Sequence, residues 1–148
     1  MVAGIPVLSQ YDDSACTYSQ KVKDIIATKK KVLIVDDEQP LLRVLSIKMR
    51  VSGYEVVTAT SGERALELVK SAHPDIMLLD IIMPGMDGLQ VLEKLRPVCD
   101  MPVITFSARA DNAGKALGLG SNDFLNKPFD VNDLVMRIKK ILEERNGG

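Results

Sequence analysis

From residue 31 onward, short apolar runs alternate with segments whose apolar residues recur at helical spacing. Three of the runs read VLIV, IMLL and VITF. Consecutive side chains of a strand point to opposite faces, so these strands would be apolar on both faces. Such strands are typical of a parallel sheet that is covered by helices on both sides. The alternation therefore predicts an α/β fold with this architecture.

Proline, glycine and serine mark where the elements begin and end. Pro40 suits the first turn of a helix, Ser61 is a candidate N-cap, and Pro97 should end the third helix early. We expect strands at 31–35, 55–59, 76–79, 103–106 and 123–125. We expect helices over 40–52, 61–71, a segment that carries Leu89, Leu92 and Leu95, 111–119 and 131–144. Right-handed crossovers favour a doubly wound five-stranded sheet of order 2-1-3-4-5. Leu41, Leu45 and Met49 should form the inner face of the first helix.

The composition limits the class of protein. A chain of 148 residues with 46% hydrophobic and 26% charged residues is long enough for one core and too apolar to be disordered. Its net charge of −1 gives no general attraction to nucleic acid or to an anionic membrane. Residues 1–30 stand outside the alternation, and we expect a flexible extension or a short docking helix there. Residues 145–148 read as a tail.

Cysteine usage and the N-terminus favour the cytoplasm. Cys16 and Cys99 form no metal-binding pattern with His73, the only histidine, so free thiols are expected. The N-terminus lacks the pattern of a signal peptide. No stretch approaches the roughly 20 apolar residues that a membrane span needs. We therefore expect neither export nor membrane insertion.

Polar residues follow the strands at the points where they end. Asp36 and Asp37 follow the first strand, Asp80 the third, Ser107 the fourth and Lys127 the fifth. Each residue alone would be read as a turn, cap or solvated loop residue. Because the carboxyl ends of parallel strands share one edge, the five side chains are expected to converge in the crevice there.

Clustered carboxylates repel one another unless a cation shares the space. With no cysteine or histidine nearby, the oxygen ligands select a hard cation, for which Mg²⁺ fits best and Mn²⁺ is an alternative. A carboxylate beside a metal ion, a lysine and a hydroxyl provides what phosphoryl transfer requires. Asp80, on the central strand, is the better candidate for the nucleophile.

The same residues resemble a known family. The chain has DD in VLIVDDE, D-x-x-M-P-x-M-D-G over 80–88, S-A at 107–108 and K-P-F at 127–129. These four motifs, in this order and at these strand ends, resemble the receiver domain of bacterial two-component response regulators. The resemblance covers about residues 31–144 and implies a flavodoxin-like fold and a signalling switch, not an enzyme acting on a separate substrate.

The resemblance also implies roles for the matching residues. Asp80 would accept a phosphoryl group from a sensor histidine kinase or a phosphotransfer protein. Lys127 would pair with the acyl phosphate, and Ser107 would donate a hydrogen bond to it. The expected metal ligands are Asp36, Asp37, Asp80 and the main-chain carbonyl of Ile82.

Phe124 stands at the position of the family's aromatic switch residue, where many relatives have tyrosine. Movement of Ser107 would let its ring turn inward and shift the surface of the fourth helix, fifth strand and fifth helix. That surface would control a downstream protein or a phosphorylation-dependent homodimer, without direct contact to nucleic acid. The bond between Lys127 and Pro128 matches one that is often cis in the family.

Two other classes of protein are alternatives. One is an interaction module with this fold that never takes phosphate, against which the presence of all the site residues argues. The other is an enzyme or cofactor domain. A flavin phosphate would be repelled by Asp36, Asp37 and Glu38, and a phosphatase of the haloacid dehalogenase type would need an aspartate at position 82. The sequence does not distinguish a complete regulator from an excised receiver.

Overall fold

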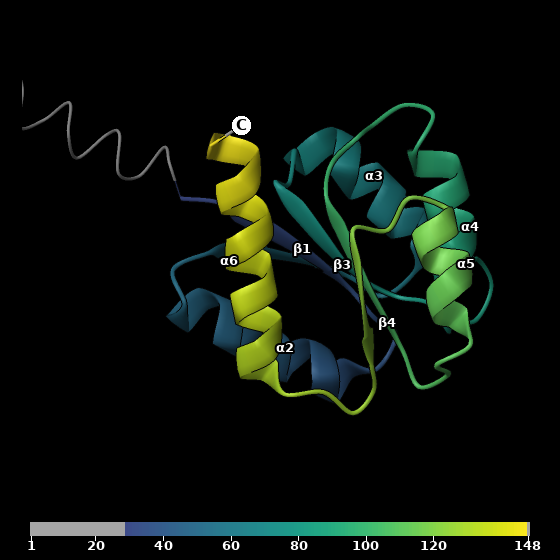
Figure 1. Ribbon diagram of the computed structural model, residues 1–148, viewed down its shortest axis with the longest axis horizontal. Helices are drawn as coiled ribbons and strands as arrows, with labels where there is room; N and C mark the ends of the chain where they lie inside the picture. The colour runs from purple at the N-terminus through teal and green to yellow at the C-terminus, as the bar shows by residue number, and fades with distance from the viewer. Residues whose placement is uncertain (1–28, 148) are drawn as a thin grey trace, which may run out of the picture.

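The computed structural model describes residues 29–147 and contains one five-stranded parallel sheet of order β2-β1-β3-β4-β5 (Figure 1). Its strands are β1 (Lys31–Val35), β2 (Glu55–Ala59), β3 (Ile76–Asp80), β4 (Val103–Ser107) and β5 (Asp123–Asn126). The predicted strand order is confirmed. β3, β4 and β5 each extend one residue beyond the expected end, so that Asp80 and Ser107 are themselves strand residues.

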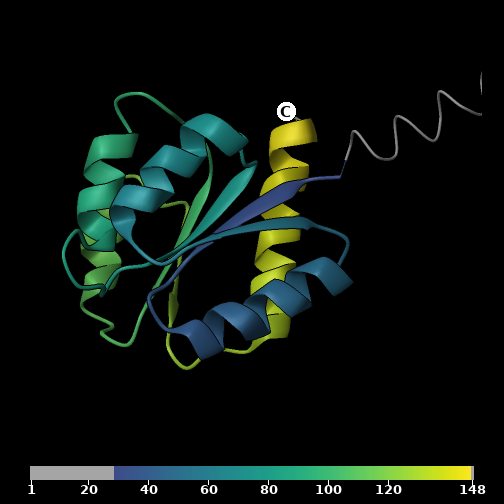
Figure 2. The same cartoon turned by 180° about the vertical axis from the view of Figure 1, so that it is seen from behind.

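Helices cover both faces of the sheet (Figures 1 and 2). They are α2 (Gln39–Val51), α3 (Gly62–Ala72), α4 (Gly88–Leu95), α5 (Asn112–Gly118) and α6 (Val131–Gly147). The core residues place α2 and α6 on one face and α3, α4 and α5 on the other. The short helix expected within residues 1–30 lies outside the described residues. Within residues 29–147, no helix combines the length and the apolar character that a membrane span requires.

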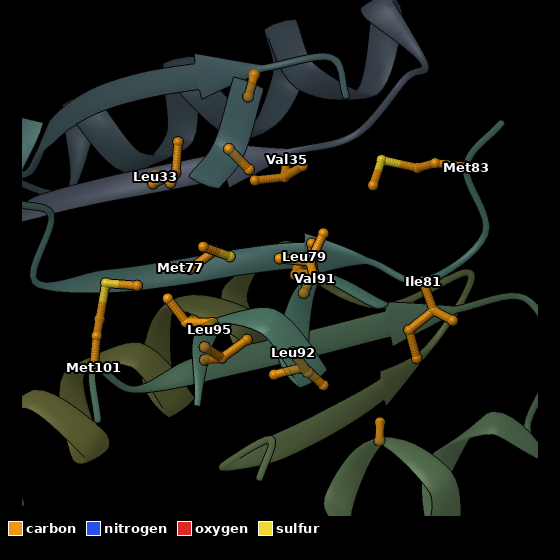
Figure 3. Close-up of a cluster of buried hydrophobic side chains, with 14 residues drawn as sticks. Leu33, Val35, Met77, Leu79, Ile81, Met83, Val91, Leu92, Leu95 and Met101 are labelled. Carbon is orange, nitrogen blue, oxygen red and sulfur yellow. The ribbon is translucent and has the colours of Figure 1, made fainter. Parts of the chain in front are cut away.

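Alternate residues of the inner strands divide the core into two layers. On β1, Leu33 faces the layer beneath α3, α4 and α5, whereas Ile34 faces the layer beneath α2 and α6. Figure 3 shows Leu79 of β3 and Leu92 of α4 in the first layer. All four side chains are fully buried. Burial on both faces is why these strands are apolar at consecutive positions.

One expectation about α2 is wrong in detail. The inner face is formed by Leu42, Leu45 and Met49, with Leu42 only 4% exposed, whereas Leu41 is half-buried at the edge of the core. Positions 41 and 42 both fit a helical period with the later leucine and methionine, so the periodicity alone did not separate them.

The polar ends of the helices follow the expected signals. The Ser61 hydroxyl accepts a hydrogen bond from the amide of Arg64 and caps α3. α4 begins with a reciprocal capping box between Asp87 and Gln90, and it ends at Leu95, two residues before the proline. A Cβ atom at Gly88 would lie 2.6 Å from the main-chain oxygen of Asp80. Glycine therefore lets α4 start against the end of β3.

Candidate functional site

The carboxyl edge of the sheet brings three of the expected residues into direct contact. Asp36 directly follows β1, Asp80 ends β3, and Lys127 directly follows β5. The Lys127 Nζ atom lies 3.2 Å from Asp36 Oδ2 and 3.5 Å from Asp80 Oδ2. Both carboxylates are almost completely buried. One ammonium group therefore bridges two acidic side chains at the ends of the neighbouring strands β1 and β3.

Lys127 is fixed by its own backbone and by aromatic neighbours. Its amide donates a hydrogen bond to the carbonyl of Ser107, and its peptide bond to Pro128 is cis, as expected. The Nζ atom lies 5.2 Å from the centroid of the Phe106 ring, which itself packs against Phe129. A cation above an aromatic face is attracted by the ring. These contacts hold the ammonium group beside the acids.

The three groups shift one another's protonation. The pKa of Asp80 is raised to about 7, chiefly because burial disfavours the charged form and also because Asp36 is close. Burial likewise raises the pKa of Asp36. Burial alone would lower the pKa of Lys127, but its hydrogen bond to Glu38 and the charges of Asp80 and Asp36 raise it overall. The lysine therefore stays charged, while the two buried acids carry negative charge that it only partly compensates.

The acid cluster has the chemistry of a cation site. Carboxylate oxygens of Asp36, Glu38 and Asp80 lie within 4.8 Å of one another. Oxygen ligands of this kind, without sulfur or imidazole, suit Mg²⁺. A divalent cation would also compensate the negative charge that raises the pKa of Asp80. The residues present therefore fit the expected metal.

Glu38 is a member of the cluster that the sequence analysis did not single out as a ligand. Its Oε1 atom lies 3.1 Å from Lys127 Nζ. The Glu38 amide donates a hydrogen bond to Asp36 Oδ1. This bond closes a turn between the end of β1 and the start of α2. Asp37, which was expected to be a ligand, is exposed and is not part of the cluster. The DDE run was the available signal, but it did not show which of the two outer acids contacts Lys127.

The remaining expected residues lie around this centre. The Ile82 amide donates to Asp80 Oδ1 at 3.3 Å. The buried Ser107 hydroxyl accepts hydrogen bonds from the Arg109 amide and from Nδ2 of Asn112, both at 3.0 Å. Phe124 of β5 is half-buried against the core layer beneath α3, α4 and α5. Asn112 is a site neighbour that sequence reasoning missed.

Comparison with known proteins agrees with this arrangement. Residues 32–139 match the model of the response regulator receiver domain family. The chain is 42% identical over 116 residues to the probable transcriptional regulator ycf27 of Cyanophora paradoxa, covering 77% of this chain and 48% of that protein. The corresponding protein of Guillardia theta is 42% identical over 123 residues, which cover 82% of this chain and 48% of that protein. The chain thus spans about half the length of these curated relatives.

Solved structures show the same fold. The receiver domain of the Francisella response regulator 1452 superposes with a TM-score of 0.74 at 33% identity, covering 80% of this chain and 99% of that one. A CheY-like receiver domain protein from Methanospirillum hungatei gives a TM-score of 0.75 at 31% identity, covering 81% and 98%. With the family's motifs at the ends of the strands and the matching fold, the chain belongs to the response regulator receiver domain family.

Proposed function

We propose that Asp80 is the phosphoacceptor of a signalling switch and receives its phosphoryl group from a partner histidine kinase or phosphotransfer protein. Receiver domains act as phosphorylation switches in two-component signalling and are not classical enzymes. The observation that carries the proposal is the position of Lys127 Nζ, 3.5 Å from Asp80 Oδ2 and 3.2 Å from Asp36 Oδ2, at the carboxyl edge of the sheet.

Asp80 is better suited to attack phosphorus than Asp36. Each oxygen of Asp36 has a close partner, because Oδ1 accepts from the Glu38 amide at 2.8 Å and Oδ2 accepts from Lys127 at 3.2 Å. The contacts of Asp80 are longer, at 3.3 Å to the Ile82 amide and 3.5 Å to Lys127. The Asp80 carboxylate is thus less engaged and closer to a free nucleophile.

In the transfer, an Asp80 oxygen forms a bond to phosphorus while the bond from phosphorus to the donor's imidazole nitrogen breaks. The electron pair of that bond stays with the nitrogen, and the imidazole leaves neutral when the other ring nitrogen of the phosphohistidine carries a proton. Lys127, which stays protonated, pairs with the new acyl phosphate and compensates part of its charge. This chain's role is therefore to position the carboxylate and to supply compensating charge.

Receiver domains bind Mg²⁺ at an acidic pocket, and this chain has one. The proposed ligands are Asp36, Asp80 and the main-chain carbonyl of Ile82, with Asp37 acting through a bound water; Mn²⁺ would serve in the same place. When bound, the ion supplies positive charge to the phosphoryl oxygens. Glu38 is not among the proposed metal ligands, because its carboxylate forms an ion pair with Lys127 at 3.1 Å.

The proposed output is a shift of the surface formed by α5, β5 and α6. Phosphorylation adds nearly two negative charges at Asp80. Ser107 ends the neighbouring strand, where Asp80 pairs with Phe106, and its hydroxyl would turn toward the phosphoryl oxygens. Phe124, which is half-buried on β5, would then turn inward. The altered surface would control a downstream protein or a second copy of the chain.

Incubation with acetyl phosphate or phosphoramidate in the presence of Mg²⁺ tests the proposal. We expect the intact mass to increase by one phosphoryl group in the wild type and not in Asp80→Asn. Asp100→Asn is the matched control, because this carboxylate is 96% exposed and lies before β4, at the opposite edge of the sheet. A gain that persists in Asp80→Asn would contradict the assignment.

A further inference from the structure

The Ser107 hydroxyl is held from the side of α5. Its oxygen accepts one hydrogen bond from the Arg109 amide and a second from Nδ2 of Asn112, both at 3.0 Å. A serine oxygen has two lone pairs, so these two donors occupy both of its acceptor positions. Ser107 is fully buried and Asn112 is only 9% exposed. The Asn112 bond is therefore largely buried.

The two bonds differ in what they connect. The Arg109 amide is two residues from Ser107 and belongs to the turn that leaves β4. Asn112 is the first residue of α5, so its bond connects the end of β4 to that helix. The Asp111 side chain does not cap α5 and pairs with Arg109 instead. The bond between Asn112 and Ser107 is thus a direct polar link from the site to the start of α5.

We propose that Asn112 is a positioning residue that restrains the Ser107 hydroxyl in the unphosphorylated state and transmits its release to α5. The inference rests on the proposed function, because a phosphoryl group on Asp80 is what would draw the hydroxyl away. Turning Oγ toward that group would remove the acceptor from Asn112 Nδ2. α5 would then lose its side-chain bond to the end of β4.

The surroundings of Asn112 lower the free-energy cost of breaking its hydrogen bond to Ser107. The side chain lines a cavity of about 370 Å³, together with Ile82, Arg109 and Lys115. An amide that loses its partner beside this partly polar cavity can bind water in place of the hydroxyl. The resting bond therefore biases the hydroxyl without locking it. A single hydrogen bond of this kind changes an equilibrium by roughly 2- to 10-fold.

Binding of beryllofluoride with Mg²⁺, a mimic of the phosphoryl group, tests the restraint. We expect Asn112→Ala to increase the apparent affinity for beryllofluoride by roughly 2- to 10-fold, because the hydroxyl no longer breaks a bond when it turns. Asn112→Leu removes the same donor while keeping the branched shape of the side chain, and should give the same increase. Leu117→Ala is the matched control, since Leu117 lies on the exposed side of α5.

A second set of measurements separates the restraint from a general effect on the helix. In a Ser107→Ala background, Asn112→Ala should leave the affinity for beryllofluoride unchanged. In the wild type, the NMR signals of the Asn112 side-chain amide should shift when beryllofluoride binds, whereas in Ser107→Ala they should stay in place. A change in affinity of the same size in both backgrounds would overturn the inference.

Beryllofluoride binding separates the role of Asn112 from the role of Asp80. If the wild type binds beryllofluoride and Asn112→Ala binds it with equal or lower affinity, Asn112 is no restraint and Asp80 remains the phosphoacceptor. If the wild type neither binds beryllofluoride nor gains a phosphoryl group, both proposals fall together.

Discussion

Asp80 is costly to ionise in the folded chain. The side chain is 3% exposed, and its pKa is raised to about 7 by burial and by the charge of Asp36, against an ordinary value of 3.8. A raised pKa means that the folded state binds the proton more tightly than the unfolded state. The contribution of Asp80 to stability is therefore full below about pH 4 and is lost as the pH rises through about 7.

This cost predicts that Asp80→Asn stabilises the chain at high pH. In the absence of divalent cations, we expect a free energy of unfolding about 1–3 kcal/mol above that of the wild type at pH 8. Asp80→Asn also loses the ion pair with Lys127. The increase in the free energy of unfolding should therefore be smaller than the pKa shift of Asp80 alone would give. The difference should shrink as the pH falls from 7 to 4, because a protonated Asp80 is also neutral. Urea unfolding across this range measures it, with Asp100→Asn as control, and a gap that does not depend on pH would contradict the explanation.

Individual site residues were predictable where the backbone alone determines their position. The meeting of Asp36, Asp80 and Lys127 follows from parallel strands that end at one edge, which the apolar runs already indicated. Glu38 and Asn112 were missed for a different reason. Their contacts depend on the turn after β1 and on the orientation of α5, and neither is fixed by hydrophobic periodicity.

At the scale of elements, the sequence predicted every strand and helix described here, with boundaries that differ slightly. β3 and β4 continue through Asp80 and Ser107 because main-chain pairing to Phe106 and Asn126 does not depend on apolar side chains. The hydrophobic pattern ends one residue earlier in both strands. This difference matters, because it gives the two site residues the rigidity of the sheet.

The segment between the site and the turn before β5 is anchored at both ends. Ser107 holds its start at the sheet edge. Its end is held by Arg96, whose guanidinium donates to the carbonyl of Gly120 at 2.7 Å and to the Asn122 side chain at 3.2 Å. The same guanidinium also binds the carbonyl of Met101 at 2.7 Å. We therefore expect any shift on phosphorylation to fall in residues 108–119, while the anchored turn stays in place.

Amide hydrogen exchange tests this division. Addition of beryllofluoride with Mg²⁺ should change exchange most in residues 108–119, and less at Gly120 and Asn122, where Arg96 holds the turn. Ser107→Ala is the control, because without the hydroxyl the change in α5 should be strongly reduced. Unchanged exchange throughout residues 108–126 would contradict a coupling from the site to α5 and β5.

The whole molecule determines the site, because its charged groups come from distant parts of the chain. Asp36 and Lys127 are 91 residues apart in sequence, and only the assembled sheet brings them to 3.2 Å. The unfolded chain therefore has no such cluster, and a cation that binds the cluster binds the folded state alone. Such binding adds to the free energy of unfolding by mass action.

Thermal unfolding with and without Mg²⁺ should show this linkage. At pH 8, Mg²⁺ at ten times its dissociation constant should add about 1.4 kcal/mol and raise the Tm by a few degrees. At pH 5.5 the increase should be smaller, because the raised pKa values of Asp80 and Asp36 let protons compete for the ligand oxygens. Asp36→Asn should lose most of the increase, whereas Asp100→Asn, distant from the edge, should retain it. If Asp36→Asn kept the full response at pH 8, the cation would bind elsewhere on the chain, and, within residues 29–147, the only cation beside the buried Asp36 and Asp80 would be Lys127.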